Sequence, residues 1–207
     1  MKNCIEIGCY PGRFLTIFGD KGIPLSGIDY VDHFYEVEQN LKDKGYKTED
    51  FINTDFTTFQ SKKKYDLVMS FGFIEHFIDW EHVFQKHIDL VADHGYIIIE
   101  TPSFHGWFQR IPRKWFYREN YNRHNIHSMI LEKWEKLLEL NGFEILNAEY
   151  FGGYDVWFEE NNLSRKKLKQ RNRLMKFLEK TRKKLIKAEN SKHFSSYLGI
   201  MAKKKSV

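Results

Sequence analysis

Short apolar runs alternate with amphipathic stretches along most of the chain. A short apolar run of Cys4, Ile5 and Ile7 stops at the turn 8–12, and Phe14, Leu15 and Phe18 then recur at helical spacing. This pattern predicts a strand, a tight turn and a helix over 12–19. The same criteria predict further strands at 25–29, 48–52, 66–70, 96–99, 143–151 and 195–202, and further helices at 32–44, 80–91 and 128–140.

Strands that alternate with helices in this way indicate an open α/β sheet. The turn after the first strand then lies at the carboxyl end of that strand. There, glycines allow a ligand to approach the backbone, and a helix N-terminus offers unpaired N–H groups. Asp29 ends the second predicted strand, and a carboxylate at that place can accept both hydroxyls of a ribose. The pattern therefore favours a nucleoside-containing ligand.

The turn itself discriminates between two such ligands. A dinucleotide fingerprint G-x-G-x-x-G that began at Gly8 would need glycine at Tyr10 and at Arg13. The middle glycine of that fingerprint allows the backbone to approach a pyrophosphate. Because S-adenosylmethionine has no pyrophosphate, Tyr10 is compatible with this methyl donor and disfavours a nicotinamide dinucleotide.

The stretch from Glu6 to Gly12 resembles the first motif of class I S-adenosylmethionine-dependent methyltransferases, which reads roughly E-x-G-x-G-x-G. This resemblance covers about three quarters of the chain and implies a transferase with S-adenosylmethionine as cofactor. It also implies a Rossmann-like, mostly parallel seven-stranded sheet with an antiparallel edge strand and helices on both faces. Further stretches that carry the resemblance lie at 28–29, 53–56, 65–76 and 95–102.

The resemblance also implies a set of donor-binding residues. Glu6 would organise the turn or the methionine end of the donor, Asp29 would bind the ribose, and Asp55 would contact the adenine amino group. Family members normally carry a helix before the first strand, whereas residues 1–3 alone precede Cys4 here. The implied cofactor-binding residues are Glu6, Gly8, Cys9, Tyr10, Gly12, Asp29, Tyr30, Asp55, Phe56, Ser70 and Phe71.

Residues 102–127 form the longest stretch without a clear period. Aromatic side chains are interspersed with cations there, just past the fifth predicted strand. A loop of this length in a compact domain is usually a lid or a binding segment. We therefore predict that this lid binds the acceptor through His105, Trp107, Trp115, Tyr117 and Arg123.

Methyl transfer needs positioning and, for a hydroxyl acceptor, a base. Histidine suits this role near neutral pH. The candidates are His76, His124 and His127, although each could instead be a structural, hydrogen-bonded residue. No metal site is predicted.

The acceptor class is narrowed by motifs that the sequence lacks. Residues 70–73 read Ser-Phe-Gly-Phe where amino-methylating nucleic-acid enzymes carry an Asn/Asp-Pro-Pro-aromatic run. Cys4 and Cys9 lie too early in the chain for a nucleophile of carbon-5 pyrimidine methylation. We therefore expect O-methylation of a small-molecule, sugar or lipid-linked acceptor. The alternatives are a donor-binding module without activity and an RNA methyltransferase.

Charge divides the chain in two. Residues 1–161 carry a net charge of −9 and residues 162–192 a net charge of +11. We predict a methyltransferase domain at 1–161 and 194–207, and a basic amphipathic helical insertion at 162–193. The insertion could bind an anionic membrane surface, pack on its own domain or in a homodimer, or, with less support, bind nucleic acid. The two cysteines and the absence of a long apolar run favour a cytoplasmic protein, which could be peripheral at the inner membrane surface.

Overall fold

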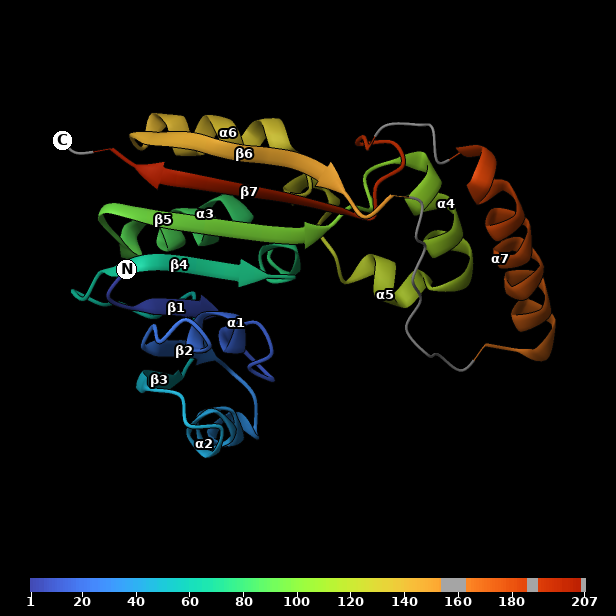
Figure 1. Ribbon diagram of the computed structural model, residues 1–207. Coiled ribbons are helices and arrows are strands. Elements are labelled where there is room, and N and C mark those ends of the chain that lie inside the picture. Colours follow the sequence, from blue (N-terminus) through green and yellow to red (C-terminus); the bar gives the residue numbers. More distant parts are fainter. Residues whose placement is uncertain (154–162, 186–189, 206–207) are drawn as a thin grey trace.

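The computed structural model describes residues 1–153, 163–185 and 190–205 (Figure 1). Its centre is a seven-stranded sheet with the strand order β3-β2-β1-β4-β5-β7-β6. The strands are β1 (Cys4–Ile7), β2 (Leu25–Asp29), β3 (Thr48–Asn53), β4 (Tyr65–Phe71), β5 (Val91–Pro102), β6 (Phe143–Phe151) and β7 (Tyr197–Lys204). The helices are α1 (Leu15–Gly19), α2 (Phe34–Asp43), α3 (Trp80–Leu90), α4 (Trp107–Phe116), α5 (Arg118–Asn122), α6 (Leu131–Leu140) and α7 (Arg165–Leu185), with short 3₁₀ helices η1 (Ile74–His76) and η2 (Ile126–Ser128).

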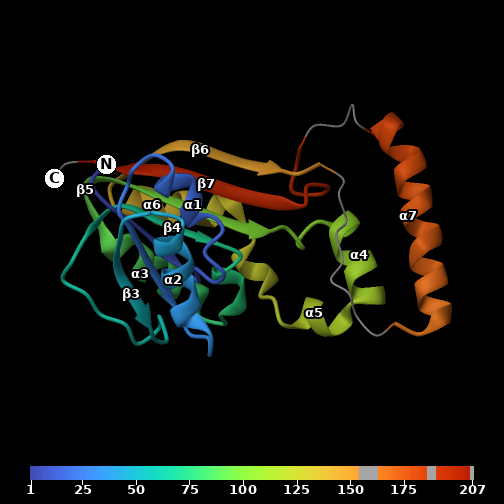
Figure 2. The ribbon, with the colours of Figure 1, turned by 60° about the horizontal axis from the view of Figure 1, so that its bottom comes forward.

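Helices pack on both faces of the sheet, as predicted. Alternate residues of one strand point to opposite faces, so Val68 of β4 belongs to one apolar core and Leu67 and Met69 to the other. The first core holds the inner faces of α3 and α6, including Phe84 and Trp134. The second core holds the inner faces of α1 and α2. The view in Figure 2 shows these helices around the sheet.

The sheet is mostly parallel, which also confirms the prediction. β1 pairs in parallel with β2 and β4, β2 with β3, and β4 with β5. β7 is antiparallel to both β5 and β6. The antiparallel strand is therefore one place inside the edge, and β6 forms the edge itself. All parallel strands end on the same side, which is where ligands bind in open α/β sheets.

The segment predicted to be an aperiodic lid is helical over much of its length. Phe108, Pro112 and Phe116 recur four residues apart and are buried, but Gln109 and Arg113 share their face of α4. These two polar side chains are themselves buried, with Arg113 Nη1 donating to the Gln109 carbonyl at 3.3 Å. A hydrophobicity pattern does not score such residues as core, and this concealed the helix.

Two predicted helix starts are wrong. Ser128 does not cap α6, because its hydroxyl donates to the Asn125 carbonyl at 2.7 Å and closes the η2 turn. The helix begins three residues later, at Leu131. α1 begins at Leu15 and not at Gly12, since Gly12 has a φ of 87° and still belongs to the turn.

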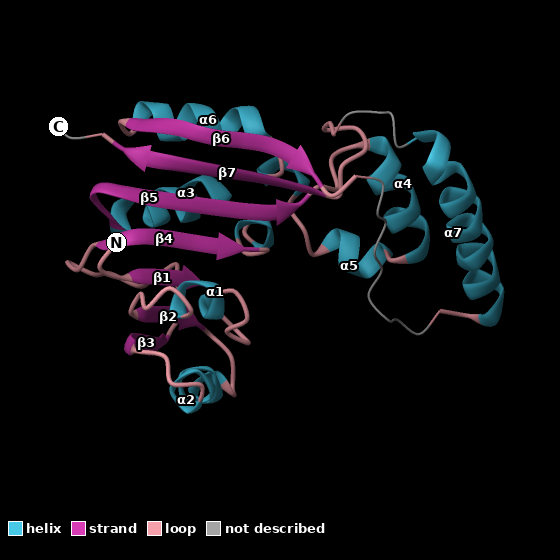
Figure 3. Ribbon diagram, viewed as in Figure 1, coloured by secondary structure: helices cyan, strands magenta, loops and turns pink. Residues whose placement is uncertain are grey.

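The basic segment forms α7 between β6 and β7. Figure 3 shows α7 beside α4, beyond the end of β5 and away from the sheet. Arg171 Nη1 of α7 donates to the Tyr117 hydroxyl at 2.8 Å. The predicted helix over 162–192 is thus observed over Arg165–Leu185. The sequence predicts an apolar stripe on this helix, formed by Leu174, Leu178, Thr181, Leu185 and Ala188. The side chains of Leu178, Thr181 and Leu185 and the whole of Ala188 lie outside the described residues.

None of the helices in the described ranges has both the length and the apolar character needed to cross a bilayer.

Candidate active site

The first predicted motif forms a tight turn after β1 that requires glycine. Gly8 has a φ of 73°, in the region that L-residues rarely adopt. A Cβ atom on Gly8 would lie 2.4 Å from a ring carbon of Phe73. Gly12 has a φ of 87°, and a Cβ there would lie 3.0 Å from Val37. The backbone of this turn is therefore held close to its neighbours, in a shape that other residues would disturb.

Asp29 ties this turn to the end of β2. One carboxylate oxygen accepts the backbone N–H of Tyr10 at 2.8 Å, and the other accepts the N–H of Tyr30 at 2.7 Å. The Tyr10 and Tyr30 side chains are exposed. Asp29 is half-buried, and each oxygen retains acceptor capacity for a second donor.

Glu6 is buried at the end of β1, as predicted, with 2% of its surface exposed. Burial raises the pKa of this carboxyl to about 8, and the charge of Asp29 contributes to the rise. Glu6 Oε2 has no hydrogen-bond partner among the described residues. A buried acceptor of this kind is costly unless a donor reaches it.

The other implied donor residues lie in different surroundings. Cys9 is buried, and its sulfur packs against Gly27 of β2. Phe56 packs within the core, 4.9 Å from the ring of His87 between centroids, and does not face the cleft described below. Asp55 is exposed, and hydrogen bonds from Thr57 lower its pKa. The hydroxyl of Ser70 is buried without a partner among the described residues.

A cleft of about 400 Å³ lies at the carboxyl ends of β4 and β5. Phe14, which follows the glycine turn, stacks on Phe71 of β4 with the ring centroids 4.2 Å apart, and both rings line the cleft. Gly8, Asp29 and Tyr30 do not line it, although they follow neighbouring strands at the same edge of the sheet. The cleft thus joins the residues that directly follow the first motif to the segment after β4. Its further lining residues are Arg13, Gly72, Glu75, His76, Glu100, Pro102, Asn120, Arg123, His124 and Tyr197.

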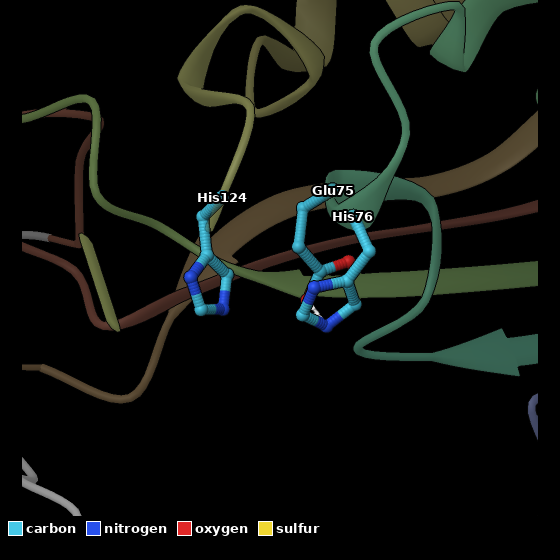
Figure 4. A group of neighbouring side chains, drawn as sticks. All are labelled: Glu75, His76 and His124. Atoms are coloured by element: carbon cyan, nitrogen blue, oxygen red, sulfur yellow. Dashed lines mark ion pairs between the residues drawn. The ribbon is translucent and has the colours of Figure 1, made fainter. Parts of the chain in front are cut away.

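Two predicted catalytic histidines meet in this cleft. The rings of His76 and His124 lie 4.8 Å apart between centroids, and the Glu75 carboxylate lies 4.0 Å from His76 Nε2 (Figure 4). His127 is exposed and does not line the cleft. The backbone N–H of His127 donates to the Asn125 side chain instead. The structure therefore brings together two of the three predicted histidines.

Glu75 and Glu100 line the same cleft but were not among the predicted site residues. Burial raises the pKa of Glu75 to about 8 and that of Glu100 to about 7. Each carboxylate has one oxygen without a hydrogen-bond partner in the described ranges. The sequence does contain a signal for Glu100 as a site residue, because this acid directly follows the apolar run 97–99 at the carboxyl end of a strand.

The predicted acceptor-binding residues are divided between the cleft and the surface. Arg123 lines the cleft. Trp107 and Trp115 are exposed on α4, whereas Tyr117 is buried and bonded to α7. His105 is exposed at the surface. Loss of part of its hydration and the charge of the neighbouring Arg110 lower the pKa of its imidazole. The structure therefore places one of these five residues at the cleft.

Comparisons with solved structures agree with this fold. A magnesium protoporphyrin IX methyltransferase from Synechocystis PCC 6803, solved with S-adenosylhomocysteine, superposes with a TM-score of 0.63 and 14% identity over 99% of this chain and 74% of its own. A SAM-dependent methyltransferase from Archaeoglobus fulgidus gives a TM-score of 0.63 and 21% identity over 98% of this chain and 86% of its own.

Sequence comparisons point the same way. Malonyl-[acyl-carrier protein] O-methyltransferase 2 from Ilyobacter polytropus is 40% identical over 70 residues, which span 33% of this chain and 27% of that relative. The family model described as "Methyltransferase domain" matches residues 1–148. The chain therefore belongs to this family, that of the class I S-adenosylmethionine-dependent methyltransferases, and S-adenosylmethionine is its cofactor.

Proposed function

We propose that the protein transfers the methyl group of S-adenosylmethionine to an oxygen atom of a small-molecule, sugar or lipid-linked acceptor. One observation carries this proposal. Phe14 and Phe71, which adjoin the donor motifs, line the same cleft as Glu75, His76 and His124. A cleft with the two phenylalanines on one side and the polar group on the other can hold a donor and an acceptor oxygen side by side.

The residues at the edge of the sheet fit the donor. The unpartnered Glu6 Oε2 suits the donor's ammonium group, and the carboxylate of Asp29 retains capacity for ribose hydroxyls. When bound, S-adenosylmethionine supplies an electrophilic methyl group on a sulfonium.

The protein's own part in the reaction is to position and prepare the acceptor. A hydroxyl acceptor would give its proton to the imidazole of His76 or His124. The acceptor oxygen attacks the methyl carbon in line, and the carbon–sulfur bond breaks with its electron pair on sulfur. Glu75, His76 and His124 are the polar groups that would hold the acceptor oxygen, and Arg13 and Arg123 would attract an anionic acceptor. The name of the Ilyobacter relative, an O-methyltransferase, supports an oxygen acceptor.

A turnover assay tests this proposal. The purified chain is incubated with S-adenosylmethionine and candidate acceptors: a malonyl thioester on a carrier protein, free carboxylic acids and hydroxylated lipids. We expect release of S-adenosylhomocysteine and one added methyl group on an acceptor oxygen by mass spectrometry. Donor binding without turnover of any acceptor would favour an inactive binding module. Methylation of nitrogen or of RNA would contradict an oxygen acceptor.

We also propose that α7 brings the domain to an anionic membrane surface. α7 carries many more cations than acids and stands apart from the sheet, next to α4 (Figure 1). A basic amphipathic helix is attracted to anionic lipid. This placement would suit a lipid-linked acceptor, because α4 and α5 lie between α7 and the cleft.

A further inference from the structure

Three potential metal ligands converge in the cleft. Glu75 and His76 come from η1, and His124 comes from the segment after α5 that faces it (Figure 4). One ligand atom from each of these residues lies within 4.8 Å of the other two. Two ligands on a tetrahedral cation with bonds of about 2.1 Å lie about 3.4 Å apart. A movement of roughly 1.4 Å by the half-exposed His76 ring therefore closes the set.

The carboxylate of Glu75 is built into this place. Its side chain is 1% exposed, and Oε2 has no hydrogen-bond partner in the part of the chain that the structure describes. Glu100, which lines the same cleft, likewise has Oε1 buried without a partner there. Two buried carboxylates, each with one oxygen that lacks a donor, are costly. A cation bound to Glu75 would offset this cost.

His124 is oriented as a metal-ligating histidine would be. Its Nδ1 lies 2.6 Å from the Asn120 carbonyl oxygen. A carbonyl oxygen can only accept, so Nδ1 carries the proton and Nε2 carries the lone pair. Ligating histidines commonly donate their other ring N–H to a carbonyl in this manner, which fixes the tautomer and the ring.

The two segments that supply the ligands are fixed to one another. The backbone N–H of Asn125 donates to the Glu75 carbonyl at 2.6 Å. The Asn125 side chain donates to the carbonyls of Phe77 at 3.0 Å and Ile78 at 3.2 Å. Asn125, the residue after His124, thus bonds to the residues on both sides of His76. The cluster is therefore held by the backbone and the side chain of Asn125.

We propose that Glu75, His76 and His124 form a binding site for a divalent transition cation of the Zn²⁺ class, open toward the acceptor side of the cleft. Two imidazoles and one carboxylate suit Zn²⁺, Fe²⁺, Co²⁺ or Ni²⁺, whereas Mg²⁺ and Ca²⁺ prefer oxygen ligands throughout. Three protein ligands with an open position are the arrangement of catalytic zinc sites.

The consequence for chemistry rests on the proposed function. A cation in this place would contact the acceptor oxygen, lower the pKa of a hydroxyl or neutralise a carboxylate, and orient it for in-line attack. Arg13 and Arg123, at the cleft's exposed rim, would then contact other anionic parts of the acceptor.

Metal titration of the whole chain tests the site. Protein freed of metal by a chelator is titrated with Co²⁺, followed by visible absorption, and with Zn²⁺ by calorimetry. We expect one ion per chain and a visible band typical of Co²⁺ with nitrogen ligands. Glu75→Gln and His124→Ala should each weaken Zn²⁺ binding at least tenfold. His82→Ala, at an exposed position of α3, should leave it unchanged.

The outcomes separate this inference from the proposed function. Absence of Co²⁺ binding, or equal binding by Glu75→Gln and the parent chain, overturns the metal site even if oxygen methylation is observed. Metal binding without methylation of any acceptor leaves the site standing and contradicts the proposed function. Circular dichroism and calorimetry with S-adenosylhomocysteine on each variant show that the fold and the donor site are intact.

Discussion

Asp29 Oδ2 accepts the backbone N–H of Tyr10 at 2.8 Å, so the acid at the end of β2 holds the turn that follows β1. The two groups are 19 residues apart in sequence, and they adjoin because β1 and β2 are parallel neighbours. Asp29 therefore has two tasks in the proposed donor site. It shapes the turn, and it offers its remaining acceptor capacity to ribose hydroxyls.

We predict that Asp29→Ala weakens donor binding more than any other single charge removal in residues 1–75. Two hydrogen bonds to a charged acceptor in a partly desolvated site contribute about 1.5 to 3 kcal/mol, or roughly 10- to 150-fold in Kd. Asp29→Asn retains one acceptor oxygen, so its Kd for the donor should lie between the values of the parent chain and of Asp29→Ala. Calorimetry with S-adenosylmethionine measures both, with the exposed Asp32→Ala as control. An affinity within twofold of the parent chain would remove the ribose assignment.

Gly8→Ala should destabilise the fold by more than its backbone conformation alone explains. An alanine at a φ of 73° costs about 1 to 2 kcal/mol, and the contact with Phe73 adds about 1 to 3 kcal/mol of overpacking. Gly22→Ala is the matched control, because its φ is 72° and a Cβ there would meet nothing within 4 Å. Urea unfolding compares the two. Equal losses of unfolding free energy would show that the Phe73 contact is unimportant.

The fold was predictable because its apolar pattern is local and regular. Residues 4–7 and 25–29 are observed as strands with the predicted bounds. The α4 helix was not predictable in this way, because the buried Gln109 and Arg113 interrupt its apolar face. Their burial depends on partners far along the chain: the Gln109 side chain donates to the Phe194 carbonyl at 2.8 Å.

The site was predictable in parts but not as an assembly. His76 and His124 were selected because histidine suits the role of a base, while nothing in their spacing of 48 residues shows that their rings meet. Glu75 was not selected, since its burial arises from the packing of η1 against the segment that carries Asn125. Such contacts between distant segments carry the chemistry here, and a local pattern does not encode them.

Trp107→Ala and Trp115→Ala should raise the Michaelis constant for the acceptor and leave donor affinity unchanged. Both indoles are exposed on α4, at 52% and 62%, on the side of the molecule beyond the strand ends. Loss of an aromatic contact of about 1 kcal/mol corresponds to roughly a fivefold rise. Leu140→Ala, at an exposed position of α6, is the control. A matching loss of donor affinity would assign α4 to the core of the domain.

The burial of Glu6 should make stability depend on pH. Its pKa is about 8 in the folded state against an ordinary value of 4.5. Below pH 4.5 both states hold the proton. Between pH 4.5 and 8 the unfolded state releases it first, so the free energy of unfolding falls as pH rises, and it levels off above pH 8. The shift corresponds to roughly 5 kcal/mol at most.

Glu6→Gln should remove this part of the pH dependence. The unfolding free energy of the variant minus that of the parent chain should therefore be larger at pH 8.5 than at pH 5. Urea unfolding at both pH values measures this difference. Glu139→Gln changes an exposed residue of α6, and its unfolding free energy should depend on pH as that of the parent chain does. If Glu6→Gln also runs parallel to the parent, the carboxyl is not buried as described.

Neutralising α7 should abolish binding to anionic liposomes. Each cation near such a surface contributes about 1 kcal/mol, so replacing four of them by glutamine should lower partitioning by far more than tenfold. Arg171 is left in place because it bonds to Tyr117. Sedimentation with anionic and neutral vesicles measures the effect, and binding by the parent chain should fall with salt. The variant replaces Lys166, Lys169, Arg173 and Lys176.

The matched control removes the same number of cations from the rest of the chain, and it should retain binding. Its four positions, Lys44, Lys47, Lys62 and Lys136, are exposed. Net charge changes equally in both variants, so a difference between them locates the effect in α7 and not in overall charge. Attraction to anionic lipid requires negative charge on the vesicle. Equal binding of the parent chain to neutral and anionic vesicles, or binding to neither, would therefore contradict the membrane proposal. Packing on a protein surface would then remain as the role of this helix.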